Sequence, residues 1–87
     1  MQVYKTTNLI NSKEYVGQDS KDRPSYLGSG TYLKKAVKKY GKKNFKKEII
    51  AWCKTQEQLD FLEIFYIDFF DTSLPKGYNC ITHSFLL

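Results

Sequence analysis

Cysteine, arginine and long apolar segments are scarce in this 87-residue sequence, and each scarcity excludes a class of protein. Two cysteines, Cys53 and Cys80, are too few for a disulfide-built scaffold or for a four-cysteine zinc site within one chain. The sequence has no apolar run of about 18 residues, so it predicts no membrane-spanning helix. Its first residues lack the apolar core of a secretory signal, and we therefore expect a cytoplasmic protein with reduced cysteines.

Aromatic residues and lysines, by contrast, are plentiful. Hydrophobic residues make up 41% of the chain and aromatic residues 16%, which suffices for one small core, so we expect residues 1–87 to form a single domain. The net charge is +5, and eight lysines fall between residues 34 and 47. So dense a cationic segment favours binding to a polyanion such as nucleic acid, although a solvated helix face would have the same composition.

The first half of the chain has the pattern of a hairpin followed by a helix. Residues 2–7 and 13–18 are rich in strand-forming side chains, with turn residues between them. Residues 19–30 contain proline and glycine and predict a loop. From Thr31, which we expect as the N-cap, apolar residues recur at helical spacing as far as Tyr40, and Gly41 ends the helix.

The second half adds a strand and a longer helix. Residues 44–52 end in an apolar run and predict a third strand. Thr55 and Gln58 form the pattern of a capping box, which opens a helix that we expect to run to about residue 70. The order β-β-α-β-α therefore predicts an α+β fold, in which two helices pack on a small antiparallel three-stranded sheet.

Tyr4 and Tyr15 are expected to meet across the hairpin. A four-residue loop at residues 8–11 would place them directly opposite each other on one face of the sheet, with Cβ atoms about 5 Å apart. A tighter turn at Asn11 and Ser12 would separate them along the sheet. Taken alone, such a pair is explained by cross-strand aromatic packing.

Glu63 lies in a strongly apolar part of the second predicted helix. Leu62, Ile64 and Phe65 are its neighbours in the sequence, and a carboxylate on such a surface must be protonated, paired or bound to a metal ion. Two interpretations stay open. Glu63 is either a partly exposed residue at the edge of the core or a functional carboxylate that faces the sheet.

Several short motifs follow one another along the chain. They are Val3-Tyr4, Tyr15-Val16-Gly17, Tyr26-Leu27-Gly28-Ser29-Gly30, the segment 34–41, Asn44-Phe45, Leu62-Glu63 with Tyr66-Ile67, and Gly77-Tyr78-Asn79. In this order and spacing the chain resembles the GIY-YIG endonuclease domain, and most of all the catalytic domains of phage and intron-encoded homing endonucleases. The resemblance covers nearly the whole chain.

The resemblance implies a metal-dependent DNA endonuclease that hydrolyses a phosphodiester bond with one Mg²⁺ or Mn²⁺ ion and nicks one strand per active site. It implies DNA as the partner, with a separate DNA-binding domain or a second copy needed for double-strand cleavage. The setting would be a bacterial or phage-infected host cell. The alternative is a catalytically inactive nucleic-acid-binding module of the same fold.

The resemblance also assigns roles to five residues of the site. Tyr4 is expected as the general base toward the attacking water, with Tyr15 orienting the water or the phosphate, although the family leaves open which phenol is the base. Glu63 is expected as the metal ligand. Arg23 is expected to bind the scissile phosphate and Asn79 to support the site.

One glycine and six lysines complete the expected site. Gly17 matches the motif glycine, where a side chain would obstruct the approach of the DNA backbone. The lysines expected to contact DNA are Lys34, Lys35, Lys38, Lys39, Lys42 and Lys43.

The region of Arg23 departs from the family pattern. Pro24 disfavours helical geometry at Arg23, so the helix that carries the family arginine is expected to be reduced to a loop. Lys34 or Lys35 could then bind the phosphate instead. The histidine that follows the family arginine is absent.

The other departures are smaller. Gln2 stands in place of the leading glycine of the first motif. Tyr26 lies near the expected site but is assigned no role, and His83 is expected to be a bystander.

Overall fold

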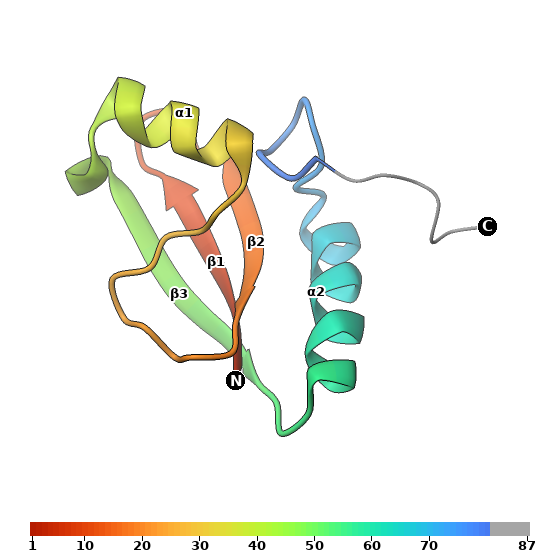
Figure 1. Ribbon diagram of the computed structural model, residues 1–87. Helices are drawn as coiled ribbons and strands as arrows, with labels where there is room; N and C mark the ends of the chain where they lie inside the picture. The colour runs from red at the N-terminus through yellow and green to blue at the C-terminus, as the bar shows by residue number, and fades with distance from the viewer. Residues whose placement is uncertain (81–87) are drawn as a thin grey trace.

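An antiparallel sheet of three strands forms the centre of the structure, a computed structural model that describes residues 1–80. The strand order is β2-β1-β3, and the elements follow one another in the predicted order (Figure 1). They are β1 (Gln2–Asn8), β2 (Glu14–Asp19), α1 (Thr31–Tyr40), a short 3₁₀ helix η1 (Lys42–Asn44), β3 (Phe45–Trp52) and α2 (Gln56–Phe70). No helix within the described residues is long and apolar enough to cross a membrane. His83 lies outside them.

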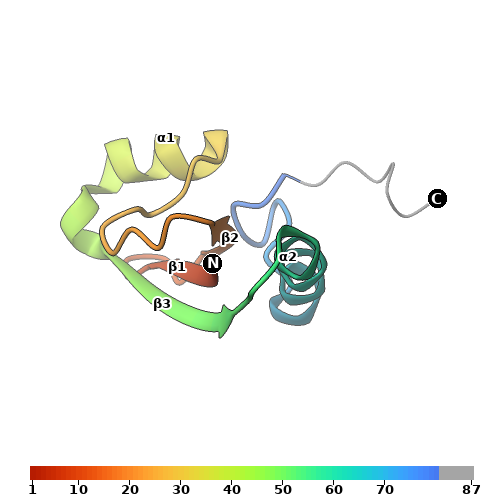
Figure 2. The same cartoon turned by 60° about the horizontal axis from the view of Figure 1, so that its bottom comes forward.

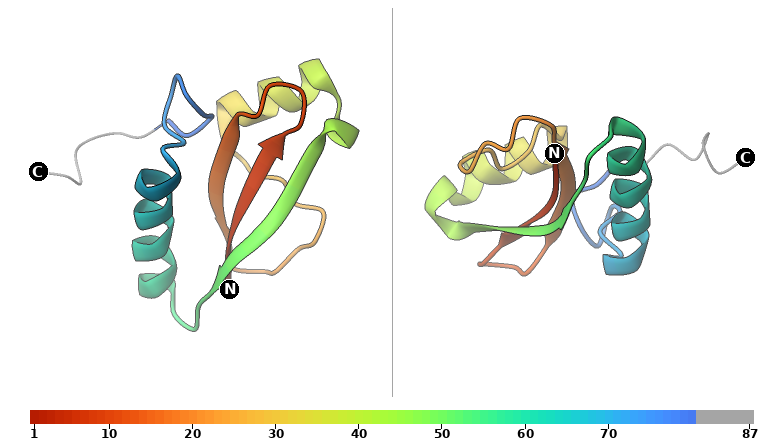
Figure 3. Two further views of the ribbon diagram at one scale, coloured as in Figure 1. Left: turned by 180° about the vertical axis from the view of Figure 1, so that it is seen from behind. Right: turned by 90° about the horizontal axis from the view of Figure 1, so that it is seen from below.

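The two helices lie on different sides of the sheet (Figures 2 and 3). On one side, Leu59 of α2 is buried in a cluster with Val3 and Val16 of the strands. On the other side, Leu33 of α1 belongs to a second cluster with Phe45 at the start of β3. Two apolar clusters therefore hold the helices to the sheet, and β2, an edge strand, lies beside both of them.

The hairpin register differs from the expected one by two residues. Five residues separate the strands, and Tyr4 lies opposite Gly17 while Tyr15 lies opposite Thr6. Asn8 stays in β1, where its N–H donates to the carbonyl of Lys13 at 2.9 Å, and this extends the ladder beyond the expected turn. Because a shift of two residues keeps side chains on the same face, the tyrosines remain neighbours, with ring centroids 6.5 Å apart.

Helix α1 begins one residue earlier than its expected cap implies. Thr31 is the first helical residue and Gly30 occupies the N-cap position, so the prediction of Thr31 as N-cap is wrong. Gly41 ends the helix as predicted, and its N–H donates to the carbonyl of Val37 at 2.9 Å. The lysines of α1 are exposed while Leu33 and Ala36 are buried, which confirms the amphipathic pattern.

Helix α2 begins with the predicted cap. The hydroxyl oxygen of Thr55 accepts a hydrogen bond from the N–H of Gln58 at 3.1 Å. The Gln58 side chain reaches back and accepts from the N–H of Lys54 at 3.1 Å, one residue before the usual partner in a capping box. These bonds fix the direction in which α2 leaves β3 and therefore the side chains that it turns toward the sheet.

The packing predicts unequal costs for two truncations in α2. Leu59 is fully buried whereas Phe61 is 67% exposed. Leu59→Ala should lower the free energy of unfolding by about 2–5 kcal/mol, because it leaves a cavity between α2 and the sheet. Phe61→Ala should change it by less than about 0.5 kcal/mol. Urea denaturation followed by circular dichroism measures both, and equal losses would contradict this packing.

Candidate active site

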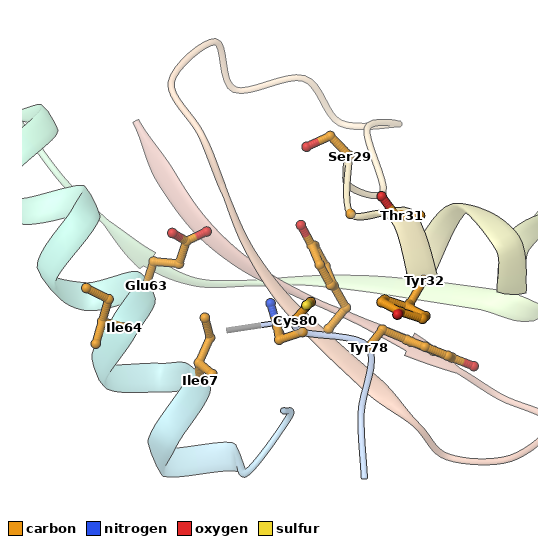
Figure 4. A pocket seen from close by; sticks show the side chains of 11 residues that line it. Ser29, Thr31, Tyr32, Glu63, Ile64, Ile67, Tyr78 and Cys80 are labelled. Atoms are coloured by element: carbon orange, nitrogen blue, oxygen red, sulfur yellow. The ribbon is translucent and has the colours of Figure 1, made fainter. Parts of the chain in front are cut away.

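A pocket of about 460 Å³ opens where β2, the N-terminus of α1 and helix α2 meet. Glu63, Ile64 and Ile67 of α2 form one wall, and Ser29, Thr31 and Tyr32 lie on the opposite wall (Figure 4). The remaining lining residues are Tyr15, Gly30, Tyr78, Asn79 and Cys80. The pocket thus brings together Tyr15, Glu63 and Asn79, three of the five residues that the sequence proposed for the site.

Glu63 is half-buried and lines the pocket from α2, on the side of the helix that faces β2. Its carboxylate accepts a hydrogen bond from the Gln18 side-chain amide of β2 at 3.0 Å. The same amide donates to Asp60 at 2.9 Å, one turn earlier in α2. Burial raises the pKa of Glu63, and the Gln18 bond opposes that rise in part. An anion held in this way is a favourable partner for a cation.

Tyr15 lies against a set of glycines beside the pocket. A Cβ atom added to Gly28 would come within 2.6 Å of the Tyr15 ring, and one added to Gly30 within 2.7 Å. The pKa of Tyr15 is raised by burial and then by the negative charge of Glu63. The Gly30 backbone and the Ser29 side chain oppose this rise by stabilising the phenolate. The Tyr15 phenol therefore lies close to both the acid and a group of hydrogen-bond donors.

Tyr4 is buried beside Tyr15 and does not line the pocket. Its side chain is 1% exposed, and its ring is packed against Tyr15 and, edge-on at 6.0 Å, against Tyr26. Burial, followed by the neighbouring tyrosines and carboxylates, raises the pKa of Tyr4 far above its ordinary value. Burial therefore disfavours the deprotonated form of Tyr4, which the role of general base expected from the sequence would require.

Gly17 accommodates the tyrosines, and the expected reason for a glycine at this position is wrong. A Cβ atom at Gly17 would come within 2.5 Å of Tyr4 Cζ and 2.9 Å of the Tyr15 ring. The space above Gly17 is filled by these two side chains, so it is not an approach route for the DNA backbone. A glycine at this position of β2 leaves the space that the rings of Tyr4 and Tyr15 fill.

Asn79 binds the main chain of β2 and thereby supports the site. Its side chain accepts from the N–H of Val16 and donates to the carbonyl of Val16, both at 2.8 Å. The Thr72 hydroxyl donates to the same side-chain oxygen at 2.6 Å. Because Val16 stands between Tyr15 and Gly17, the Asn79 amide fixes the stretch of β2 that presents the phenol.

Arg23 lies in the loop after β2, which is not helical, as the sequence predicts. Its guanidinium forms an ion pair with Asp19 at 3.3 Å and lies 4.0 Å from the centroid of the Tyr26 ring. The Arg23 side chain is 49% exposed, but it is not part of the pocket lining. The structure therefore places Arg23 outside the pocket lining, where it contacts Asp19 and Tyr26.

Asp19 organises this loop from a buried position. It accepts hydrogen bonds from the backbone N–H groups of Lys21 at 2.9 Å and Arg23 at 2.7 Å, besides the guanidinium contacts. Burial alone would raise the pKa of Asp19, but these bonds and the positive charge of Arg23 hold it below 3.8, its ordinary value. The buried carboxylate thus takes the place of a helix in fixing Arg23.

Lys47 of β3 contacts the buried Tyr4, although the sequence did not indicate Lys47 as a site residue. Its ammonium lies 4.6 Å from the centroid of the Tyr4 ring and donates to the carbonyl of Arg23 at 2.7 Å. Burial is the main cause of the lowered pKa of Lys47. Strand alternation could have found it, because Lys47 shares a sheet face with the buried Phe45, two residues before.

The residues of the pocket fit Mg²⁺ or Mn²⁺ with Glu63 as the protein ligand. Within residues 1–80, no group of three or more histidine, cysteine or acidic side chains lies close enough together to enclose a metal ion. Mg²⁺ commonly takes one or two carboxylates and fills its other positions with water and phosphate oxygens. A single half-buried carboxylate beside an open pocket suits that mode of binding.

The buried Asp19 predicts a pH-dependent stability difference. Its lowered pKa stabilises the folded chain above pH 3.8, and this contribution is lost as the pH falls toward the folded-state pKa. Asp19→Asn should therefore lower the free energy of unfolding by about 1–3 kcal/mol at pH 7. The difference in free energy of unfolding between the unmodified chain and Asp19→Asn should become smaller below pH 4. Urea denaturation at several pH values measures this difference, and a difference that does not change with pH would contradict this role.

The sequence is matched by a family model described as "Putative endonuclease segE, GIY-YIG domain", over residues 18–79. That range includes Arg23, Glu63 and Asn79 and begins after Tyr4 and Tyr15. The match therefore does not depend on the two phenols.

Curated relatives come from Enterobacteria phage T4. "Putative endonuclease segE" is 50% identical over 58 residues, which cover 64% of this chain and 28% of the relative. "Putative endonuclease segD" is 38% identical over 76% of this chain and 30% of the relative. "Endonuclease segA" is 51% identical over 59% of this chain and 24% of the relative. The chain spans less than a third of the length of these relatives.

A solved structure confirms the predicted fold. The "Structure of the Catalytic Domain of Homing Endonuclease I-TevI" superposes with a TM-score of 0.76 at 22% identity, covering 93% of this chain and 98% of that one. With the sequence match over residues 18–79, this fold leads to one assignment. The chain belongs to the GIY-YIG endonuclease family.

Proposed function

We propose that this chain is the catalytic part of a metal-dependent DNA endonuclease, which hydrolyses one phosphodiester bond per active site and so nicks DNA. The observation that carries the proposal is that Tyr15 and Glu63 line one pocket. Asn79, which lines the same pocket, binds the main chain of β2 next to Tyr15. A phenol and a half-buried acid on one open pocket supply a proton acceptor and a metal ligand. The relatives named endonucleases support the same activity.

Glu63 would hold one Mg²⁺ or Mn²⁺ ion in this proposal. When bound, such an ion neutralises the carboxylate, stabilises negative charge on the phosphate and favours the phenolate of Tyr15. Gln18 keeps the Glu63 carboxylate oriented through its hydrogen bond at 3.0 Å. Gln18 itself accepts from the Gln56 side chain at 2.7 Å, so the acid is supported from both β2 and α2.

Tyr15 is the phenol that we assign to the attacking water. It borders the pocket, and the Gly30 backbone and the Ser29 side chain favour its deprotonated form. Tyr4 packs against the Tyr15 ring, and the Lys47 ammonium lies 4.6 Å from the centroid of the Tyr4 ring. This division of roles replaces the expectation that Tyr4 is the base.

DNA is the proposed partner, bound through phosphate contacts. The six lysines expected to contact DNA lie on exposed surface of α1 and η1, and none of them lines the pocket that contains Glu63. Arg23 could contact the phosphate only by sharing its guanidinium with Asp19.

A separate DNA-binding domain or a second copy would be needed for double-strand cleavage. The proposed setting is the cytoplasm of a phage-infected cell, where Cys53 and Cys80 stay reduced.

Removal of the acid tests the metal site. Glu63→Gln should reduce nicking of supercoiled plasmid in Mg²⁺ by at least about 100-fold, because the metal loses its charged ligand. Chelation of the metal should abolish nicking by the unmodified chain. Agarose electrophoresis of the relaxed product over time measures both effects.

The matched control is Glu57→Gln, an exposed acid in the first turn of the same helix. It changes the net charge equally and should leave the nicking rate within about twofold. Equal activity of Glu63→Gln and Glu57→Gln would remove Glu63 from the mechanism. Metal-independent DNA binding without any nicking by the unmodified chain would favour the inactive binding module instead.

The two phenols give a second, paired test. Tyr15→Phe should lower the nicking rate by about 10²- to 10⁴-fold, which is the usual contribution of a general base. Tyr4→Phe, which removes a buried hydroxyl, should lower it by less than about tenfold. Single-turnover nicking rates at saturating protein separate chemistry from binding, and the reverse order of the two losses would return the base to Tyr4.

A further inference from the structure

A second pocket, of about 290 Å³, lies on the other side of the loop that borders the active site. Its lining residues are Ser25, Tyr26, Leu27, Gly28, Lys34, Val37 and Lys42. Among them, Lys34 and Lys42 were expected to contact DNA, whereas Tyr26 was assigned no role. The loop from Ser25 to Gly30 therefore separates two hollows, because Ser29 and Gly30 line the active-site pocket and the preceding residues line the second one.

The loop between the pockets is fixed to the sheet. The Thr6 hydroxyl of β1 donates to the carbonyl of Leu27 at 2.7 Å. Gly28 has φ +136°, and an added Cβ would come within 2.5 Å of Leu33 and 2.6 Å of Tyr15. From residue 27 to residue 30 the chain spans at most about 10 Å, which equals about three base steps of B-DNA. The backbone segments that border the two pockets are therefore separated by no more than the length of about three nucleotides.

The lining of the second pocket combines an aromatic ring, apolar side chains and two cations. The Tyr26 ring lies 4.0 Å from the Arg23 guanidinium and forms a T-shaped pair with Tyr4, with ring centroids 6.0 Å apart. Lys34 comes from α1 and Lys42 from η1, so two lysines line the pocket from two separate elements. No acidic side chain lines it. This combination matches a nucleotide, in which an aromatic base adjoins an anionic phosphate.

We propose that this pocket binds one nucleotide of the DNA strand that enters the active site, with its base against Tyr26 and its phosphates on Lys34 and Lys42. The proposal rests on the proposed function, because it makes the pocket a substrate subsite. It also distinguishes among the lysines expected to contact DNA, since Lys35, Lys38, Lys39 and Lys43 do not line the pocket.

A comparison of two single strands without metal tests whether the base is bound. A labelled twelve-nucleotide thymidine strand and a fully abasic strand of the same length carry equal charge. The unmodified chain should bind the thymidine strand about tenfold more tightly, as measured by fluorescence anisotropy, because stacking stabilises bound bases. Tyr26→Leu should abolish that preference, and Tyr26→Phe should retain it since the ring remains.

Two double variants test the phosphate contacts. Lys34→Ala with Lys42→Ala should reduce the slope of log affinity against log salt by about 1.4, as expected for two contacts to a single strand. Lys35→Ala with Lys43→Ala removes the same charge from the same two elements and should reduce it by less than half as much. Circular dichroism checks that each variant is folded.

The outcomes separate this inference from the proposed function. Equal binding of the thymidine and abasic strands by the unmodified chain, or equal slopes for the two double variants, would overturn the subsite. A base preference in a chain that fails to nick plasmid would overturn only the endonuclease assignment. Because binding is measured without metal and without turnover, the two failures cannot be confused.

Discussion

The pair of hydrogen bonds between the Asn79 amide and the main chain of Val16 is the constraint on which the site depends. β2 is an edge strand, and an edge strand without a partner has unpaired main-chain groups and a poorly fixed path. The amide supplies one partner at 2.8 Å for each main-chain group of Val16, and the N–H of Tyr78 adds a bond to the carbonyl of Glu14. The residue that presents the phenol is thereby held from both sides.

Glycines make room for two large rings, Tyr4 of β1 and Tyr15 of β2, which lie side by side on the sheet. The rings of Tyr4 and Tyr15 lie over Gly17, and the loop at Gly28 and Gly30 closes over Tyr15. Each of these glycines removes a Cβ that the rings would overlap, so the aromatic layer is defined by close packing as well as by the ladder. Lys47 adds a cation over the buried ring. The half-buried Tyr15 lines the pocket whereas the fully buried Tyr4 does not, so the two phenols occupy different environments.

The fold could be predicted from the sequence to a large extent, because its signals are local. Each signal involves residues close together in the sequence. Examples are the helical spacing of apolar residues after Thr31, the N-cap at Thr55 and the apolar run that ends at Trp52. The hairpin register could not be predicted, because it depends on Asn8 remaining in the ladder. The nearness of Tyr15 and Glu63 follows from the family order. The burial of Tyr4 and the ion pair of Arg23 with Asp19 could not be predicted, because they depend on three-dimensional packing and not on the spacing of residues in the sequence.

The two helices carry charges of opposite sign. α1 contains four lysines and no acidic residue, whereas α2 contains Glu57, Asp60, Glu63 and Asp68 and no basic residue. Separated charges of this kind give the molecule a large electric dipole, which orients it during diffusional encounter with a polyanion. Phosphates are drawn toward α1 and repelled from α2 until a cation neutralises the acidic side. In the proposed endonuclease, the metal concentration would then also govern the orientation of the encounter.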